Sequence, residues 1–210
     1  TINPYEFAID AGYSRMLSER FSMAVNMRFI FSDIRYDYTA ESSAGKAFAA
    51  DIAMYRLGYF MMGSRECSFA WGLNINNIGS KISYGGDDNA EFIPTNLRLG
   101  LNMTVPFNEY NKFSVAVDAN KLLVPTYPKQ DTENGETDND YTDRVQKDYY
   151  DVSPIAGIFK SFYDAPNGFK EEMQEIQWSV GCEYTYNDRF MLRGGYHHEA
   201  ANKGNRKYFT

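Results

Sequence analysis

The sequence predicts an all-β protein: a transmembrane antiparallel β-barrel, of which about eight to nine strands are present in these 210 residues. Three observations predict this class. Apolar and polar residues alternate with a period of two in successive segments, as in strands that face lipid on one side and a lumen on the other. The polar positions carry mainly small or amide side chains. The connections between the segments alternate between short and long along the whole chain.

The clearest predicted strand covers residues 21–31, where Phe, Met or Val occupies every odd position and Ser, Ala, Asn and Arg occupy positions 22 to 28 between them. Each apolar face is about 10 residues long, enough to cross the roughly 25 Å apolar band of an outer membrane at a tilt near 45°. In the segment at 48–54, Arg56 interrupts the apolar face, which predicts either a bulge near Tyr55 or the end of the strand. The same alternation occurs at 6–13, 48–54, 69–76, 97–104, 113–120, 176–184 and 190–197, and a ninth strand begins near 206–209.

The polar faces distinguish a barrel from a sandwich, whose solvent-facing positions would be long and charged. Here isolated charges of both signs are spread over different strands, as suits a crowded lumen in which they can pair. The predicted lumen charges are Arg28, Asp51, Arg98, Asp118, Glu183 and Arg193.

The connections predict the topology, because barrels of this kind have short periplasmic turns and longer extracellular loops. Short connections lie at 18–20, 62–66, 106–111 and 186–188, and long ones at 32–47, 79–93, 121–175 and 198–207. An open sheet is not tolerated in lipid, so we expect further strands outside this sequence. The predicted domain is one partial barrel over residues 1–210 with a long extracellular loop at 121–175.

The long loop has two halves. Residues 130–143 are polar and acidic and predict a flexible, solvated segment. In the second half, Ser153 can cap a helix and Pro154 suits its first position. Apolar residues then follow at helical spacing, which predicts either a helix that caps the barrel mouth or an element that docks a partner or plugs the lumen. A second short helical segment is expected at 169–175. The candidate partner-binding residues are Ile155, Ile158, Phe159, Phe162 and Tyr163.

Composition and sequence motifs exclude several classes of function. The net charge of −7 argues against nucleic-acid binding, and there is no apolar run long enough for a transmembrane helix. Cys67 and Cys182 fall three predicted strands apart and are expected to be unpaired. His197 and His198 are neighbours on a strand, so they point to opposite faces and are poor candidates to share a metal. No catalytic motif is present, and no cofactor or metal is predicted.

Five segments, 3–18, 73–83, 93–100, 153–164 and 194–209, resemble the PorV family of outer-membrane barrels of the type IX secretion system. The resemblance implies a FadL-like barrel of 14 strands in the outer membrane of a Gram-negative bacterium. It also implies a non-enzymatic role: such barrels receive secreted cargo through its C-terminal domain from the translocon. They then pass it to a surface attachment complex that contains a sortase-like protease.

Two functions therefore compete. The first is a cargo-shuttle barrel that holds partners at its extracellular rim. The second is a FadL-like channel for hydrophobic small molecules, which requires a largely apolar pocket in the lumen. The small, polar residues predicted for the lumen weigh against the channel. An outer-membrane hydrolase would need a nucleophile and a base, and the sequence offers no such pair.

Overall fold

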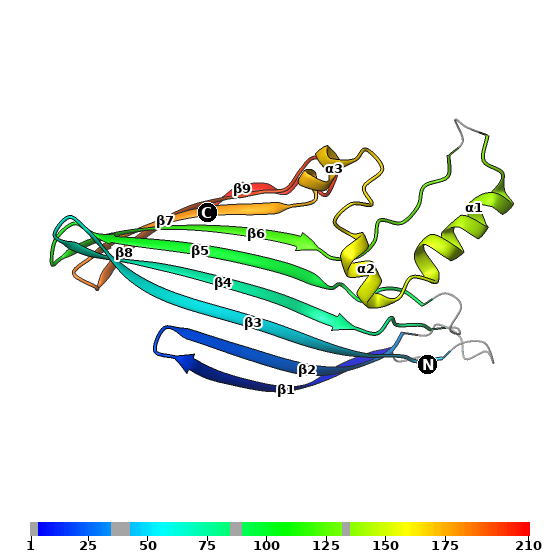
Figure 1. Cartoon of the computed structure of the whole chain (residues 1–210), viewed down its shortest axis with the longest axis horizontal. Coiled ribbons are helices and arrows are strands. Elements are labelled where there is room, and N and C mark those ends of the chain that lie inside the picture. Colours follow the sequence, from blue (N-terminus) through cyan, green and yellow to red (C-terminus); the bar gives the residue numbers. More distant parts are fainter. Residues whose placement is uncertain (1–3, 35–42, 85–89, 132–134) are drawn as a thin grey trace.

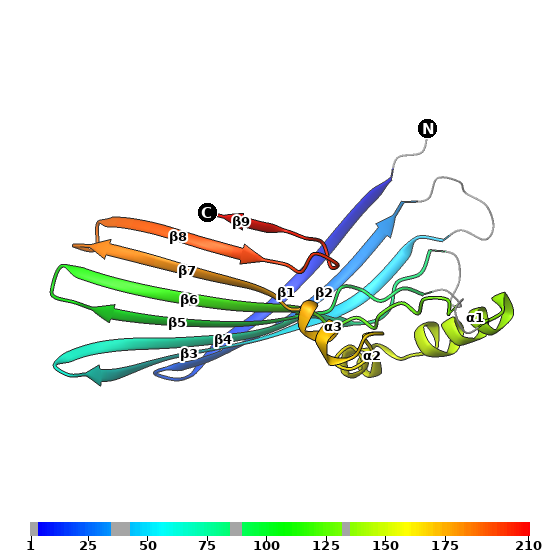
Figure 2. The same cartoon turned by 90° about the horizontal axis from the view of Figure 1, so that it is seen from above.

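The computed structural model describes residues 4–34, 43–84, 90–131 and 135–210. Nine strands pair in sequence order into a single antiparallel sheet. Figures 1 and 2 show that the sheet is long, twisted and curved. The strands are β1 (Tyr5–Ser18), β2 (Phe21–Asp33), β3 (Gly45–Met62), β4 (Arg65–Gly79), β5 (Asn96–Pro106), β6 (Asn111–Leu122), β7 (Gln177–Tyr186), β8 (Phe190–His198) and β9 (Lys207–Phe209). Each predicted strand segment is therefore confirmed.

The register places apolar residues opposite apolar residues, so the sheet has one apolar and one polar face. Phe29 lies opposite Phe48, and Arg28 lies opposite both Asp10 and Ala49 on its two neighbouring strands. Residues directly opposite each other share a face. Large apolar side chains along the apolar face stay exposed, among them Met27, Phe48 and Leu99. An exposed apolar face of this extent is typical of a surface in lipid.

Strand β3 differs from its prediction around Arg56. Its pairing with β4 continues without a register shift from Ile52 to Met62, so the strand neither bulges near Tyr55 nor ends there. Arg56 lies opposite Phe21 at the start of β2, level with the turn that ends the β1–β2 hairpin. Arg at such a position can extend its charged end into the aqueous interface while its stem covers apolar surface.

The irregularity between β3 and β4 lies elsewhere, at the shift between Ala50 and Ile52. There, Asp51 faces a β4 segment that contains Asn77, whose φ is 57°. Asn tolerates this left-handed conformation better than most residues. Both expectations for the segment around Arg56, a bulge near Tyr55 or the end of the strand, are therefore wrong.

The connection between β6 and β7 contains helices α1 (Asp138–Val145), η2 (a π-helix, Gln146–Tyr150), α2 (Pro154–Lys160) and α3 (Phe169–Gln174). The predicted helix after Ser153 and the predicted short helix near 169 are confirmed. The expectation of a flexible segment at 130–143 is wrong for α1. Thr137 caps this helix: its hydroxyl oxygen accepts from the Asp140 N–H at 3.2 Å and donates to the Asp140 carboxylate at 2.6 Å.

Within the described part of the chain, no helix is both long and apolar enough to cross a membrane. Both cysteines are free, and they lie on β4 and β7, three strands apart, as predicted.

Candidate functional site

The long connections meet at one end of the sheet, and we call this end the loop-side rim. It comprises the described residues of the connections 80–95, 123–176 and 199–206. Two residues of the first connection lie on the polar face: Ile82 and Ile93 pack with Ala47, Ala49 and Ile30 in a small apolar core. This packing gives the rim a fixed base, which η2 and α2 contact. In Figure 1 these two helices lie at the ends of β4 and β5, whereas α3 lies beside the ends of β7 and β9.

Helix η2 is held on that base through Lys81, Glu91 and Phe92. The Lys81 ammonium donates to the backbone oxygens of Tyr149 at 3.1 Å and Tyr150 at 2.7 Å, and lies 4.1 Å from the centre of the Phe92 ring. Burial is the largest influence on Lys81 and lowers its pKa. The Tyr149 hydroxyl donates to Glu91 at 3.0 Å, and burial followed by this bond raises the pKa of Tyr149. The raised pKa keeps the Tyr149 hydroxyl protonated near neutral pH, and both groups serve as structural contacts.

Helix α2 rests on the rim through a glycine. Ser153 caps it by accepting from the Ala156 N–H at 3.3 Å, as the sequence predicts. Gly157 is buried, and a Cβ there would lie 2.7 Å from Phe92 Cε1 and 3.0 Å from Pro125 Cγ. The side of α2 that carries Gly157 therefore faces the rim, and the side chains of Ile155 and Phe159 remain exposed.

The predicted partner-binding residues consequently differ in their exposure to solvent. Phe159 and Tyr163 are 65% and 73% exposed, and Ile155 is also exposed. Ile158 is partly buried. Phe162 lines an apolar groove of about 230 Å³ together with Phe169, Met173, Leu97 and Leu99. Leu97 and Leu99 belong to the apolar face, so Phe162 and α3 lie on that side of the sheet. This places α3 beside the apolar face of the sheet.

Five charged side chains hold α3 on the rim. The ammonium of Lys121, at the end of β6, lies 3.1 Å from Glu172 and 2.6 Å from Glu175. The ammonium of Lys203, in the β8–β9 connection, lies 2.9 Å from both Glu171 and Glu175. We call these residues the rim charge cluster. It joins three segments that are distant in sequence.

The rim charge cluster has clear electrostatic consequences. The hydrogen bond from Lys203 is the largest influence on Glu171 and lowers its pKa to about 2. For Glu175, burial alone would raise the pKa, but the hydrogen bonds from Lys121 and Lys203 outweigh it and the pKa is lowered. Burial would lower the pKa of Lys203, but the same carboxylates raise it. Glu171, Glu175 and Lys203 are therefore ionised near neutral pH. Sequence reasoning missed the cluster, because its members come from separate segments.

The predicted lumen charges lie on the polar face, and the structure brings some of them together. Arg28 donates to Asp10 at 2.7 Å, to Asn77 at 2.6 Å and to Asp51 at 3.4 Å. Glu183 and Arg193 form an ion pair between β7 and β8. Asp118 lies opposite Gly100, where a Cβ would meet its carboxylate oxygen at 2.7 Å.

These ion pairs run along the wall between adjacent strands. For Arg98 and Asp118 the structure gives no ion pair with a described residue. The sequence missed the part played by Asp10, although its place directly opposite Arg28 on the polar face was the available signal.

The two histidines point to opposite faces, as predicted. His197 lies 2.9 Å from the Ser179 hydroxyl, whereas His198 stacks on Trp178 at 5.0 Å between ring centres. In the described residues, no group of three or more His, Cys, Asp or Glu is arranged to hold a metal.

A curved antiparallel sheet with one apolar face, one polar face and turns of alternating length defines the class: the fold is that of part of a β-barrel wall. The chain belongs to the PorV family, since the model of the family described as type IX secretion system protein PorV matches residues 1–129. The match covers β1 to β6 and ends before α1. No curated protein matches the chain.

Proposed function

We propose that this protein is an outer-membrane barrel that carries secreted cargo within the type IX secretion system. In this proposal it binds the C-terminal domain of each cargo protein as it leaves the translocon. It then delivers the cargo to a surface attachment complex with a sortase-like protease. The family membership supports the secretion role, and the cargo step is our extension of it.

One observation supports a docking site for cargo on α2: the helix exposes its large apolar side chains, whereas Gly157 packs against the rim. Ile155, Phe159 and Tyr163 are more than half exposed, although Gly157 on the same helix is buried. Exposed aromatic residues on a rigid support are typical of binding hot spots, since they bury much area at little cost in conformational entropy. Phe162 is a weaker candidate, because it already lines the groove beside α3.

The polar face weighs against the alternative of a channel for hydrophobic small molecules. The hydrogen-bonded network of Asp10, Arg28, Asp51 and Asn77 occupies this face over β1 to β4. A site for a hydrophobic molecule would be mostly apolar, with few polar groups. The apolar groove beside Phe162 lies against the opposite face of the sheet.

The test is capture of a purified cargo C-terminal domain by the full-length protein in detergent. Phe159→Asp together with Tyr163→Asp should weaken binding about thirtyfold or more, since a hot spot contributes about 2 kcal/mol or more. The matched control is Tyr110→Asp, an exposed aromatic residue in the β5–β6 turn at the opposite end of the sheet. Undiminished capture by the double variant would remove α2 from the mechanism. Absence of capture by the unaltered protein would contradict the cargo role itself.

A further inference from the structure

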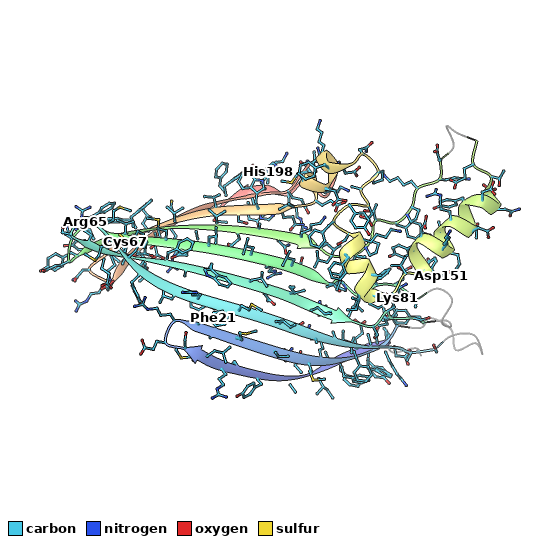
Figure 3. The ribbon with its side chains drawn as sticks, in the orientation of Figure 1. Phe21, Arg65, Cys67, Lys81, Asp151 and His198 are labelled. Atoms are coloured by element: carbon cyan, nitrogen blue, oxygen red, sulfur yellow. The ribbon has the colours of Figure 1, made fainter. Side chains whose placement is uncertain are left out.

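The hairpins at the short-turn end of the sheet differ in length. The β1–β2 hairpin turns at Arg20, whereas β3 continues to Met62 before its own turn. The last backbone hydrogen bond between these hairpins, among the described residues, is donated by the Leu57 N–H to the Arg20 carbonyl at 3.0 Å. Figure 3 shows Arg65 and Cys67 at the tip of the β3–β4 hairpin, well beyond Phe21 at the start of β2. In the described part of the chain, residues 58–62 of β3 consequently have no strand paired with them on the β2 side.

The free side of this segment carries backbone groups that remain available for pairing. Met62 and Arg65 pair across a two-residue turn, and bonding alternates along an antiparallel strand. Gly58, Phe60 and Met62 therefore bond to β4, while Tyr59 and Met61 direct their N–H and C=O groups to the open side. Among the described residues, no backbone hydrogen bond beyond the sheet ladder involves Tyr59 or Met61. This gap lies between two hairpins of the chain itself, so strands before β1 or after β9 would not fill it.

The side chains of this edge are apolar on both faces. Tyr59 and Met61 alternate with Phe60 and Met62, and all four are exposed. Natural edge strands are usually protected from pairing by charged residues, proline or bulges. Residues 57–62 contain neither charge nor proline, and their pairing with β4 has no register shift. An edge with these properties favours the addition of another strand.

The surroundings of the edge are basic. The Arg20 guanidinium lies 5.6 Å from the centre of the Tyr59 ring, and Arg56 is exposed next to Leu57. Within the described chain, neither arginine has an ion pair with a carboxylate. A strand that binds here would gain from an acidic residue close to these two guanidinium groups.

We propose that residues 57–62 form a docking edge for an extended segment of a protein partner, which adds to the sheet as one further strand. The segment has apolar side chains and an acidic residue at the end that faces Arg20 and Arg56. An extended backbone is the occupant that matches the alternating free groups of Tyr59 and Met61, which neither lipid nor a folded surface would satisfy. The edge lies at the opposite end of the sheet from α2, so this site is separate from the proposed cargo site.

The test uses a fluorescent hexapeptide, acetyl-Thr-Val-Thr-Val-Thr-Asp-amide, whose acidic C-terminal end meets Arg20 and Arg56 when it runs antiparallel to β3. It is added to the full-length protein in detergent micelles, and binding is measured by anisotropy. The unaltered protein should bind it saturably. Tyr59→Pro together with Met61→Pro removes both free donors without touching the ladder to β4, and should weaken binding at least about tenfold. The matched control, Tyr59→Thr with Met61→Thr, keeps the donors and should retain the peptide. Infrared spectra of all three proteins should show the same strand content.

A second arm alters the peptide. N-methylation of every second amide blocks one edge of the peptide strand, so one methylation register should abolish binding and the other should retain it. Equal binding of the two registers would overturn the proposal, as would the absence of saturable binding or equal binding to empty micelles. Cargo capture is measured on the same preparations, and it should be unchanged in the proline variant. The two proposals can therefore fail separately.

Discussion

Replacement of Lys121 by Met tests whether the rim charge cluster holds α3 in place. The Lys121 side chain is 7% exposed and its partner Glu172 is 8% exposed, so the ion pair between them is nearly free of water. Met preserves the volume of the stem but removes the ammonium, which leaves a buried carboxylate without its cation. We therefore expect α3 and Phe169 to detach from the rim more often, while the sheet stays folded.

The magnitude follows from what each carboxylate retains. Breaking a buried ion pair costs about 3–5 kcal/mol when the remaining charge has no other partner. Here Glu175 keeps Lys203, and Glu172 keeps the Ala165 N–H at 2.8 Å. We therefore expect a smaller loss, about 2–3 kcal/mol, which corresponds to a roughly 30- to 150-fold larger detached fraction.

Hydrogen exchange measured on full-length protein in detergent reads this fraction directly, because amides of α3 exchange when the helix detaches. The control is Lys112→Met at the other end of β6, where the ammonium lies 2.7 Å from Asp188 but both side chains are largely exposed. An exposed pair contributes less than about 1 kcal/mol, so this variant should leave local exchange nearly unchanged. Equal effects of the two variants would refute the argument from burial, and no acceleration in α3 would show that the cluster does not hold it.

Three further outcomes are expected. Gly157→Ala should loosen α2 by about 1–3 kcal/mol through overpacking, seen as faster proteolysis near that helix, whereas Gly181→Ala has ordinary room and should not. Acid should release α3. The pKa of Glu171 is lowered to about 2 from 4.5, so its stabilising effect is complete above about pH 4.5 and declines towards pH 2. Lys203 has a raised pKa and loses its charge only above pH 10.5. If the exchange rates of the α3 amides, each divided by the rate of an unfolded chain at the same pH, were equal at pH 6 and pH 3, this prediction would be contradicted. Arg28→Met leaves two carboxylates without their cation and should cost about 2 kcal/mol in thermal unfolding followed by infrared spectroscopy; an unaltered transition would show that the network contributes nothing.

The strands could be predicted from the sequence because their signal is local. A side chain on a strand faces one side or the other, and the lipid and the lumen impose opposite preferences at every second position. Residues 21–31 follow this rule at each step. Arg56 violates it, yet β3 continues, because backbone pairing to β4 on one side is enough to extend a strand beyond the apolar band.

The rim was less predictable, since its contacts join distant segments. Ser153 and Pro154 predicted the start of α2 correctly. The side of the helix that is buried depends on Gly157 and on Phe92, which lies 65 residues before Gly157 in the sequence. Helix α1 had a local signal that was overlooked: Thr137 and Asp140 have the spacing of a capping box. The acidic composition around it masked that signal. No pattern in the sequence indicates that Lys121, Glu175 and Lys203 would meet.

The connection between β6 and β7 also bears on how the chain folds. Residues 123–176 separate these strands, whereas residues 187–189 separate β7 from β8, an eighteenfold difference in length. Joining the ends of the longer loop costs about 2.5 kcal/mol more in chain entropy. Prior folding of η2 and α2 against Lys81, Glu91 and Phe92 shortens the distance that the free chain must close. We therefore expect β7 to pair with β6 late, after the helices have formed, so that assembly of the rim controls the rate at which the second half of the sheet is added.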